Sequence, residues 1–334
     1  MSRYADSHKT PLGAGDARPT ALQIIKDEGL EGNMKDKVFL VTGVSSGIGI
    51  ETGRALAATG ARVFLTARSL EKGQAACEQF LEPGRVELLE LDTSNLSSVR
   101  SAAASFLQKS PTLNVLICNA GVMQIPTREE TSEGFEMQLT TNYLGHYLLF
   151  DLLKDALLKA STPEFNSRLV NVSSAGHHMS EIVFDDLQLQ GPDAYGPWKA
   201  YGQSKLAQIY MANYVDRNFG PLGLHALSLM PGGIITGLQK HVPEEIRASW
   251  DKIPEVRNFL KSLEQGAATT VLAAVGKEWE GKGGKYLEDC RVALFEPLVE
   301  TMMGVSKYAY DETKEDKLWE LTRRILALNN PKGS

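Results

Sequence analysis

Two patterns of apolar and polar positions alternate along most of the chain. The first is a short run that is apolar on both faces, as in KVFLVTG at 37–43. Such runs are typical of buried parallel strands. They recur at 61–68, 86–92, 113–121, 168–174, 223–233 and 284–289. The second pattern has apolar residues at helical spacing, and it predicts helices over 48–59, 70–81, 95–108, 132–160 (one helix or two), 199–218 and 265–276.

Strands that alternate with helices at this spacing predict a three-layer α/β/α fold. Its centre is a doubly wound parallel sheet of about seven strands, and in such sheets ligands bind at the carboxyl ends of the strands. We expect a single catalytic domain over 36–290, in which a polar segment at about 236–262 is a substrate lid or a solvated helical hairpin. An extension (1–35) with a loose beginning and a short helix precedes it, and a helical tail (291–334) follows.

Composition narrows the class of protein. The formal net charge of −6, without a block of Lys or Arg, argues against a nucleic-acid or anionic-membrane surface. No apolar run approaches the roughly 18 residues that span a bilayer, and the N-terminus has no apolar signal core. The three cysteines are far apart and form no CxxC pair, which suits a reducing compartment. We therefore expect a soluble cytoplasmic protein without a membrane anchor.

A glycine-rich turn joins the first strand to the helix after it, with the sequence TGVSSGIG at 42–49. Glycines there allow backbone N–H groups to approach a pyrophosphate, and the start of the helix adds favourable partial charge. The alternative is a tight turn without a ligand. The predicted cofactor contacts in this turn are Gly43, Ser45, Ser46, Gly47, Ile48 and Gly49.

The end of the second strand indicates which dinucleotide would bind. Sites for NAD place an acid there for the ribose 2′-hydroxyl, but this strand ends in Arg68. A guanidinium matches a phosphate, so we predict NADP(H) with Arg68 on the 2′-phosphate; the alternative is a solvated surface arginine. Asp92, beside Thr93, can bond the adenine edge or cap the helix that begins near 95.

Candidate catalytic residues follow in the second half of the chain. Tyr201 and Lys205 lie four residues apart, on one face of a predicted helix. A nearby ammonium lowers the pKa of a phenol, so that Tyr201 can act as acid in reduction or base in oxidation. Lys205 can also hold the nicotinamide ribose. In isolation this pair is more often an ordinary surface contact.

Three further features favour the catalytic interpretation. Ser174 ends the fifth strand, where its hydroxyl can hold a substrate carbonyl. Asn142 lies on a long helix, and its carbonyl can anchor a water that relays protons to Lys205. Asn119, Ala120 and Gly121 form a turn at the end of the fourth strand, beside the expected cofactor. The adjacent His177 and His178 suggest a metal, but neighbouring histidines point in different directions and no third ligand is evident.

Together these motifs resemble the short-chain dehydrogenase/reductase family over roughly residues 36–290. The matching segments are TGVSSGIG, the NAG at 119–121, Asn142, VNVSS (170–174), YGQSK (201–205) and PGGIIT (231–236). The resemblance implies a Rossmann-type fold and a catalytic tetrad of Asn142, Ser174, Tyr201 and Lys205, with Ser174 chosen over Ser173 by its place in the motif. It also implies cofactor contacts from Pro231, Gly232, Ile234 and Thr236.

Within that family the chain looks most like the branch of retinol dehydrogenases and WW-domain oxidoreductases, which generally prefers NADP(H), and like its soluble fungal members. Retinol is doubtful as substrate because the membrane anchor of those enzymes is missing. We expect a carbonyl or alcohol on an apolar or aromatic small molecule; the alternative is a non-redox protein of the same fold, namely a cofactor-binding regulator, isomerase or cyclase. A homodimer through 132–160 and 199–218 is possible. Expected pocket residues are Leu238, Trp250, Ile253, Phe259, Phe295, Met302 and Met303.

Overall fold

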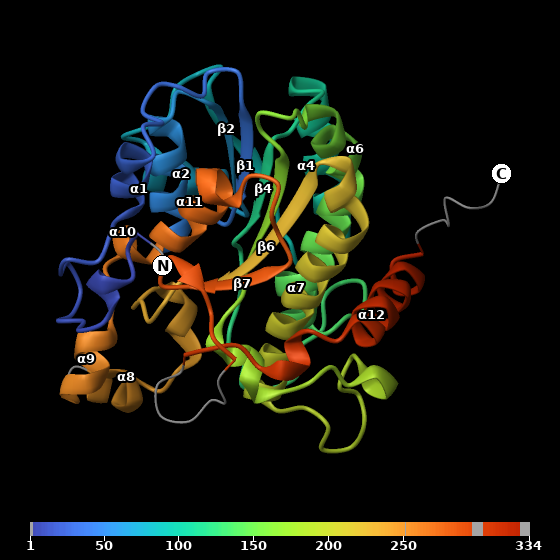
Figure 1. The fold of residues 1–334 in the computed structure, drawn as a ribbon. Coiled ribbons are helices and arrows are strands. Elements are labelled where there is room, and N and C mark those ends of the chain that lie inside the picture. Colours follow the sequence, from blue (N-terminus) through green and yellow to red (C-terminus); the bar gives the residue numbers. More distant parts are fainter. Residues whose placement is uncertain (1–2, 251, 296–302, 328–334) are drawn as a thin grey trace.

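The computed structural model describes residues 3–250, 252–295 and 303–327, and it places an eight-stranded sheet at the centre of the protein (Figure 1). The spatial order is β3-β2-β1-β4-β5-β6-β7-β8. Neighbouring strands are parallel as far as β7, and β8 pairs with β7 antiparallel. The strands are β1 (Val38–Thr42), β2 (Arg62–Ala67), β3 (Val86–Glu90), β4 (Val115–Cys118), β5 (Ser167–Val172), β6 (Leu224–Met230), β7 (Lys285–Glu288) and β8 (Arg291–Val292).

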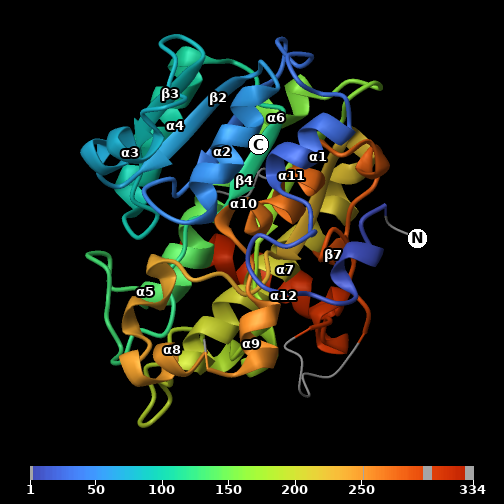
Figure 2. The same cartoon turned by 90° about the vertical axis from the view of Figure 1, so that its left-hand side faces the viewer.

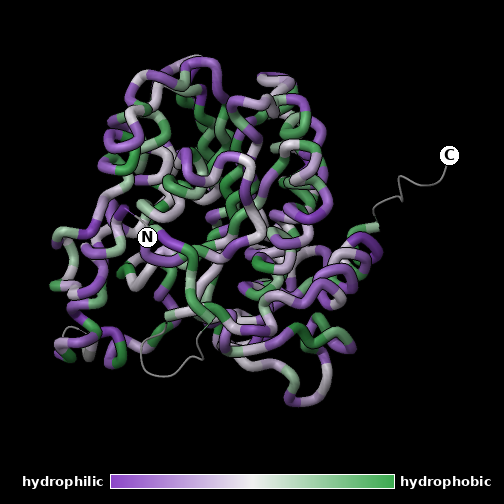
Figure 3. Tube along the Cα trace, in the orientation of Figure 1, coloured by the Kyte–Doolittle hydropathy of each residue, from purple (hydrophilic) through white to green (hydrophobic). Residues whose placement is uncertain are grey.

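Helices cover both faces of the sheet and bury a separate apolar cluster on each (Figures 2 and 3). One face carries α1 (Ala21–Asp27), α2 (Ile48–Ala58), α3 (Leu70–Cys77), α10 (Leu263–Gly266) and α11 (Ala268–Val275). The other carries α4 (Leu96–Lys109), α6 (Gly145–Ala160) and α7 (Pro197–Phe219). The predicted α/β/α architecture and all seven predicted strands are therefore confirmed, and β8 is an addition that the sequence pattern did not reveal.

The segment at 132–160, predicted as one helix or two, contains a change of helix type. A short α5 (Met137–Leu139) passes into a π-helical turn, η2 (Thr140–Leu144), which continues directly as α6. A π-turn inserts one extra residue into the helix and is frequent at functional sites. Asn142 lies at its centre.

The lid segment folds into short helices at one end of the sheet, below the strands in Figure 1. They are η6 (Gly237–His241), α8 (Glu244–Trp250) and α9 (Pro254–Phe259). The described part of the C-terminal tail contains η8 (Lys307–Ala309) and α12 (Glu312–Ile325). Trp319 of α12 stacks on Tyr214 of α7, with 4.0 Å between the ring centroids, and also contacts Tyr147 of α6. This helix therefore occupies part of the surface at which a homodimer was expected.

Described residues of the N-terminal extension pack against the lid, so the prediction of a loose beginning is wrong for this part of the chain. Arg18 is 4 % exposed, and its guanidinium donates to the carbonyls of Phe259 (2.9 Å) and Leu260 (2.6 Å) at the end of α9. Asp16 holds the same guanidinium at 2.8 Å. One arginine thus satisfies carbonyls that a helix end leaves without partners. These hydrogen bonds join residues about 240 positions apart in the sequence, and they hold the extension in place.

Among the residues that the structure describes, no helix is both long enough and apolar enough to cross a bilayer.

Candidate active site

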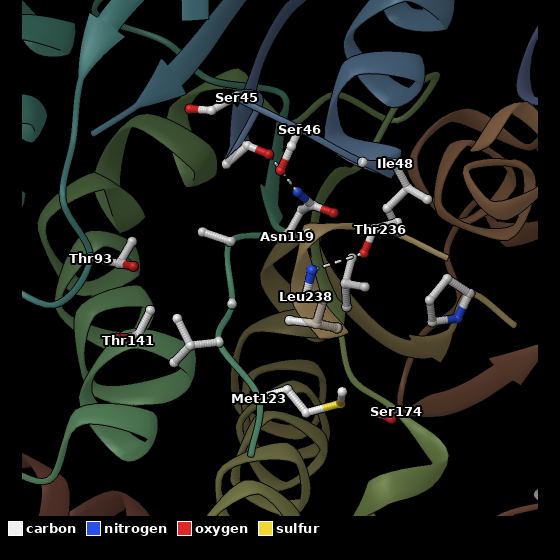
Figure 4. Close-up of a pocket in the computed structure, with 18 of the residues that line it drawn as sticks. Ser45, Ser46, Ile48, Thr93, Asn119, Met123, Thr141, Ser174, Thr236 and Leu238 are labelled. Carbon is white, nitrogen blue, oxygen red and sulfur yellow. Dashed lines mark hydrogen bonds between the residues drawn. The ribbon is translucent and has the colours of Figure 1, made fainter. Parts of the chain in front are cut away.

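A cavity of about 650 Å³ opens where the parallel strands end (Figure 4). The turns after β1, β2, β3, β4, β5 and β6 contribute to its wall, as do α7 and the start of the lid. Every residue predicted for cofactor binding or catalysis lines this cavity, except Gly49 and Asn142. The fold thus gathers into one site residues that are up to about 190 positions apart in the sequence.

The glycine turn is tight and also faces the cavity. Gly43 and Gly47 have φ angles of 77° and 72°, and a Cβ on Gly43 would lie 2.7 Å from the Cα of Ala120. The Asn119 amide donates to the carbonyls of Thr42 (2.8 Å) and Gly43 (3.1 Å) and so fixes the turn from the side of β4. The turn is therefore tight in either interpretation, and its contact with a pyrophosphate stays a prediction.

The outer end of the cavity carries two exposed cations. Arg68 has no hydrogen bond or ion pair with any other described residue. Lys72 lies in the first turn of α3, where Ser69 caps the helix, and all three residues line the cavity. A cation near a helix N-terminus is unfavourable unless an anion lies close by. That unusual placement was a signal for Lys72, which the sequence reasoning missed.

Asp92 does not cap the helix after β3. Its Oδ1 accepts from the backbone N–H of Ser94 (2.9 Å) and from the Ser94 hydroxyl (2.6 Å). The helix is capped instead by Asn95, whose side chain accepts from the N–H of Ser98. The capping alternative for Asp92 is therefore wrong, and Asp92 and Thr93 both lie in the cavity wall.

The inner end of the cavity is formed by Tyr201 and Lys205 on α7. Tyr201 is 2 % exposed, and burial raises the pKa of its phenol to about 12, against the opposing effect of a hydrogen bond with Ser174. Lys205 donates from Nζ to the Val172 carbonyl (2.9 Å) and to Gln208 Oε1 (3.0 Å), and burial lowers its pKa to about 7. The sequence interpretation expected a lowered pKa for this phenol, but its pKa is raised, because desolvation outweighs the hydrogen bond with Ser174.

The two serines after β5 have different environments. The Ser173 hydroxyl donates to the backbone carbonyl of Lys205 (2.8 Å) and is turned into the fold. The Ser174 hydroxyl accepts from the N–H of Gly176 (3.0 Å) and bonds to Tyr201. Of the two, only Ser174 has its hydroxyl bonded to the phenol, and Figure 4 shows Ser174 at the edge of the cavity.

Asn142 is buried behind the cavity. Its amide accepts from the N–H of Val122 (2.8 Å) and donates to the Val122 carbonyl (3.0 Å) and to Ser204 (2.8 Å). Its backbone carbonyl accepts from His146 Nδ1 (2.9 Å). Asn142 therefore joins the turn after β4 to α7, and its role in a proton relay stays a prediction.

His146 was not predicted, although it lies one helical turn after Asn142. Since its Nδ1 donates to a carbonyl, its Nε2 accepts from the hydroxyl of Thr42 at 2.9 Å. Burial lowers the pKa of the imidazole to about 4. A neutral histidine thus ties the glycine turn to the π-helical turn.

The turn after β6 is held from behind by the end of the lid. Lys261 donates from Nζ to the carbonyl of Pro231 (3.2 Å) and pairs with Asp289 at 2.7 Å. Gly232 has a φ of 114°, and a Cβ there would lie 2.7 Å from the Lys261 side chain. Only glycine therefore fits at position 232 of this turn, which was predicted to contact the nicotinamide.

Apolar groups from the lid and from the turn after β4 cover Tyr201. Met123, Tyr201 and Val242 form a small cluster, and Leu238 and Trp250 pack against it. This arrangement favours the lid over the solvated hairpin.

The other residues expected at the pocket behave differently. Ile253 is 43 % exposed and Phe295 is 59 % exposed. Phe259 and Met303 pack against the core and do not line the cavity. Met302 lies outside the described residues.

Comparisons with known proteins show which family the chain is similar to. The sequence matches the model of the short chain dehydrogenase family over residues 37–186. The short-chain dehydrogenase/reductase prx1 of Penicillium roqueforti is 56% identical over 328 residues, 98% of this chain and 96% of that protein. Human retinol dehydrogenase 11 is 38% identical over 87% of this chain and 86% of its own. A crystal structure of an uncharacterized protein from Mycobacterium paratuberculosis superposes with a TM-score of 0.69 at 30% identity, covering 94% of this chain and 100% of that one.

Proposed function

Because the chain belongs to the short-chain dehydrogenase/reductase family, whose members are oxidoreductases that bind nicotinamide cofactors, we propose that it interconverts a carbonyl and an alcohol with NADP(H). The observation that carries this proposal is the meeting of Ser174, Tyr201 and Lys205 at the inner end of a cavity whose outer end holds a glycine turn and two cations. We further propose that the protein acts in the cytoplasm, in keeping with three buried cysteines that are widely separated in the sequence.

The preference for NADP(H) over NAD(H) rests on charge at the outer end. Arg68 and Lys72 are exposed cations on the cavity wall, and the acid that would bond a ribose 2′-hydroxyl does not follow β2. A phosphate would receive charge-assisted hydrogen bonds from both side chains. The residues present therefore fit the phosphorylated dinucleotide.

The chemistry divides between the cofactor and the chain. When bound, the nicotinamide supplies or accepts the hydride. The Ser174 hydroxyl donates to the substrate oxygen and holds it near the phenol. In reduction Tyr201 gives its proton to that oxygen, and in oxidation its phenolate takes the proton back. Burial opposes the phenolate, so the ammonium of Lys205, 5.7 Å from the centre of the tyrosine ring, is needed to stabilise it.

An apolar or aromatic substrate is the class that the lid favours. The groups around Tyr201 are a thioether, two aliphatic side chains and an indole, contributed by Met123, Leu238, Val242 and Trp250. A polar or charged compound would lose its hydration here without gaining hydrogen-bond partners.

The test follows NADPH and NADH absorbance against a panel of aromatic, aliphatic and charged carbonyl compounds. We expect turnover of apolar ketones or aldehydes with NADPH, and its loss in Tyr201→Phe. Turnover of small charged compounds alone would refute the substrate class. Cofactor binding without turnover of any carbonyl or alcohol would point to a non-redox role on the same fold.

A further inference from the structure

The turn that carries Ser174 is held by the C-terminal part of the chain. After β5 the chain forms the 3₁₀ turn η3 (Ala175–Met179), with Ser174 as its N-cap. Gly176 of this turn lies against the ring of Tyr201, where a Cβ would come 2.5 Å from Cε1. A displacement of η3 would therefore move both the Ser174 hydroxyl and the backbone that packs against the tyrosine ring.

His177 connects this turn to residues 303–310. Its Nδ1 lies 2.7 Å from the Ser174 carbonyl, and its Nε2 accepts from the backbone N–H of Ser306 at 3.2 Å. An N–H group only donates and a carbonyl only accepts, so the proton of the imidazole must be on Nδ1. Both ring nitrogens are thereby used, and the side chain is 0 % exposed.

Other contacts strengthen the same junction. The Ser306 hydroxyl lies 2.6 Å from Nδ1 of His178, and the Tyr308 hydroxyl donates to the His177 carbonyl (3.0 Å). The His177 ring also contacts Tyr286 of β7, with 5.0 Å between the ring centroids. The histidine pair that suggested a metal in the sequence thus binds residues 303–310 instead.

We propose that His177 is a positioning residue: it transmits the anchoring of residues 303–310 to the Ser174 carbonyl and thereby fixes the Ser174 hydroxyl beside Tyr201. The inference rests on the proposed function for its account of Ser174. It assigns a role in the reaction to a side chain that does not touch the cavity, and to a segment about 130 residues further along the chain.

Three substitutions separate the two bonds of the imidazole. His177→Asn keeps a donor near the Nδ1 position, His177→Gln keeps an acceptor near Nε2, and His177→Phe keeps only the ring. We expect kcat with NADPH to fall about tenfold in His177→Phe and in His177→Gln, with the KM for NADPH unchanged. His177→Asn should recover most of the activity, because the bond to Ser174 is the one that matters.

Two controls test whether His177 affects kcat through Ser174. Ser306→Ala removes the hydroxyl bond to His178 but leaves the N–H, and we expect kcat within twofold of wild type. In a Ser174→Ala background, His177→Phe should cost no more than a further twofold, because the group that it positions is already gone. A full tenfold loss in that background would contradict the proposal.

Hydrogen exchange of the Ser306 amide gives a readout that does not depend on activity. Exchange should be faster in His177→Phe and His177→Asn than in wild type, and protected in His177→Gln. If Ser174→Ala and Tyr201→Phe lose activity but the His177 variants keep it, the inference is wrong and the proposed function stands. If wild type turns over no carbonyl, the proposed function fails and the role of His177 in it fails too, while exchange still reports the contact.

Discussion

The two ends of the cavity differ in how far their charged and titratable side chains are buried. At the inner end, Tyr201 and Lys205 are 2 % and 4 % exposed, and burial has moved both pKa values towards the neutral forms. At the outer end, Arg68 and Lys72 are exposed, and we propose that they bind the 2′-phosphate. Buried groups act through protonation and geometry and are little affected by salt, whereas exposed cations act through charge that salt screens. Substitutions at the inner end should therefore lower kcat, whereas substitutions at the outer end should raise the KM for NADPH.

Tyr201→Phe should produce the largest effect. The phenol is the only proposed proton donor for the substrate oxygen, so its removal should lower kcat by about 10²- to 10⁴-fold. The change is measured as NADPH oxidation with the best ketone of the panel. The dissociation constant for NADPH should stay within twofold, and a variant with wild-type kcat would rule out the mechanism.

Ser174→Ala should come next. Loss of a donor aimed at the reacting oxygen typically costs about 10²-fold or more in kcat. Ser173→Ala is the matched control, because the Ser173 hydroxyl bonds to the Lys205 backbone and not to the phenol. Steady-state kinetics that showed the larger loss in the Ser173 variant would reverse the assignment of the two serines.

Arg68→Gln should affect cofactor choice instead of chemistry. Loss of a charge-assisted bond to the 2′-phosphate, worth about 1.5–3 kcal/mol, should raise the KM for NADPH about 10- to 100-fold. The kcat and the KM for NADH should change little. Equal losses with both cofactors would place Arg68 away from the 2′-phosphate.

Lys72→Gln should have a smaller effect of the same kind. An exposed lysine without a fixed geometry contributes about 0.2–1 kcal/mol, so the KM for NADPH should rise about 1.5- to 5-fold. Repeating the kinetics near 1 M salt, where the Debye length is about 3 Å, should reduce the difference from wild type. A difference that persists in salt would mean that Lys72 acts by packing.

Two buried histidines beside the inner end should make the fold sensitive to acid. Burial lowers the pKa of His146 to about 4 and that of His177 to about 3, from about 6.5 when unfolded. The unfolded chain therefore binds protons first as the pH falls below 6.5, and this part of the stability is lost progressively towards pH 4. Each histidine should contribute about 1.4 kcal/mol per pH unit to the fall in unfolding free energy.

Urea unfolding at pH 6.5, 5.5 and 4.5 measures that slope. Carboxylates contribute to it as well, so the informative quantity is the difference between wild type and His177→Phe. The variant should show a slope smaller by the contribution of one histidine. An unchanged slope would mean that His177 is not kept neutral by burial.

Much of the sheet was predictable because the cause is local. Strands buried on both faces need continuous apolar runs, and those runs are visible in the sequence before anything is known of their neighbours. The place of Gly43 and Arg68 at the carboxyl end of the sheet was predictable for the same reason, since a glycine turn and the residue that ends a strand lie at fixed places in a βαβ unit. The resemblance to retinol dehydrogenases was confirmed by the similarity to human retinol dehydrogenase 11.

The contacts that hold the site were not predictable, because each joins residues far apart in the chain. Arg18 looked like part of a loose polar segment, yet it is buried against the end of α9. Lys72 looked like one of several helix lysines until α3 was placed at the cavity. The high pKa of Tyr201 follows from burial under the lid, which no spacing of Tyr and Lys in the sequence reveals.

The sequence alone thus established the positions of seven strands along the chain, the α/β/α architecture and the residue types available at the strand ends, because these depend on local pattern and on the geometry of βαβ units. Only the tertiary structure decided which serine faces the phenol, that Asn142 is enclosed by Val122 and Ser204, and that residues 303–310 reach Ser174 through His177. Those outcomes depend on burial and on hydrogen bonds between distant segments, which exist only once the chain has folded.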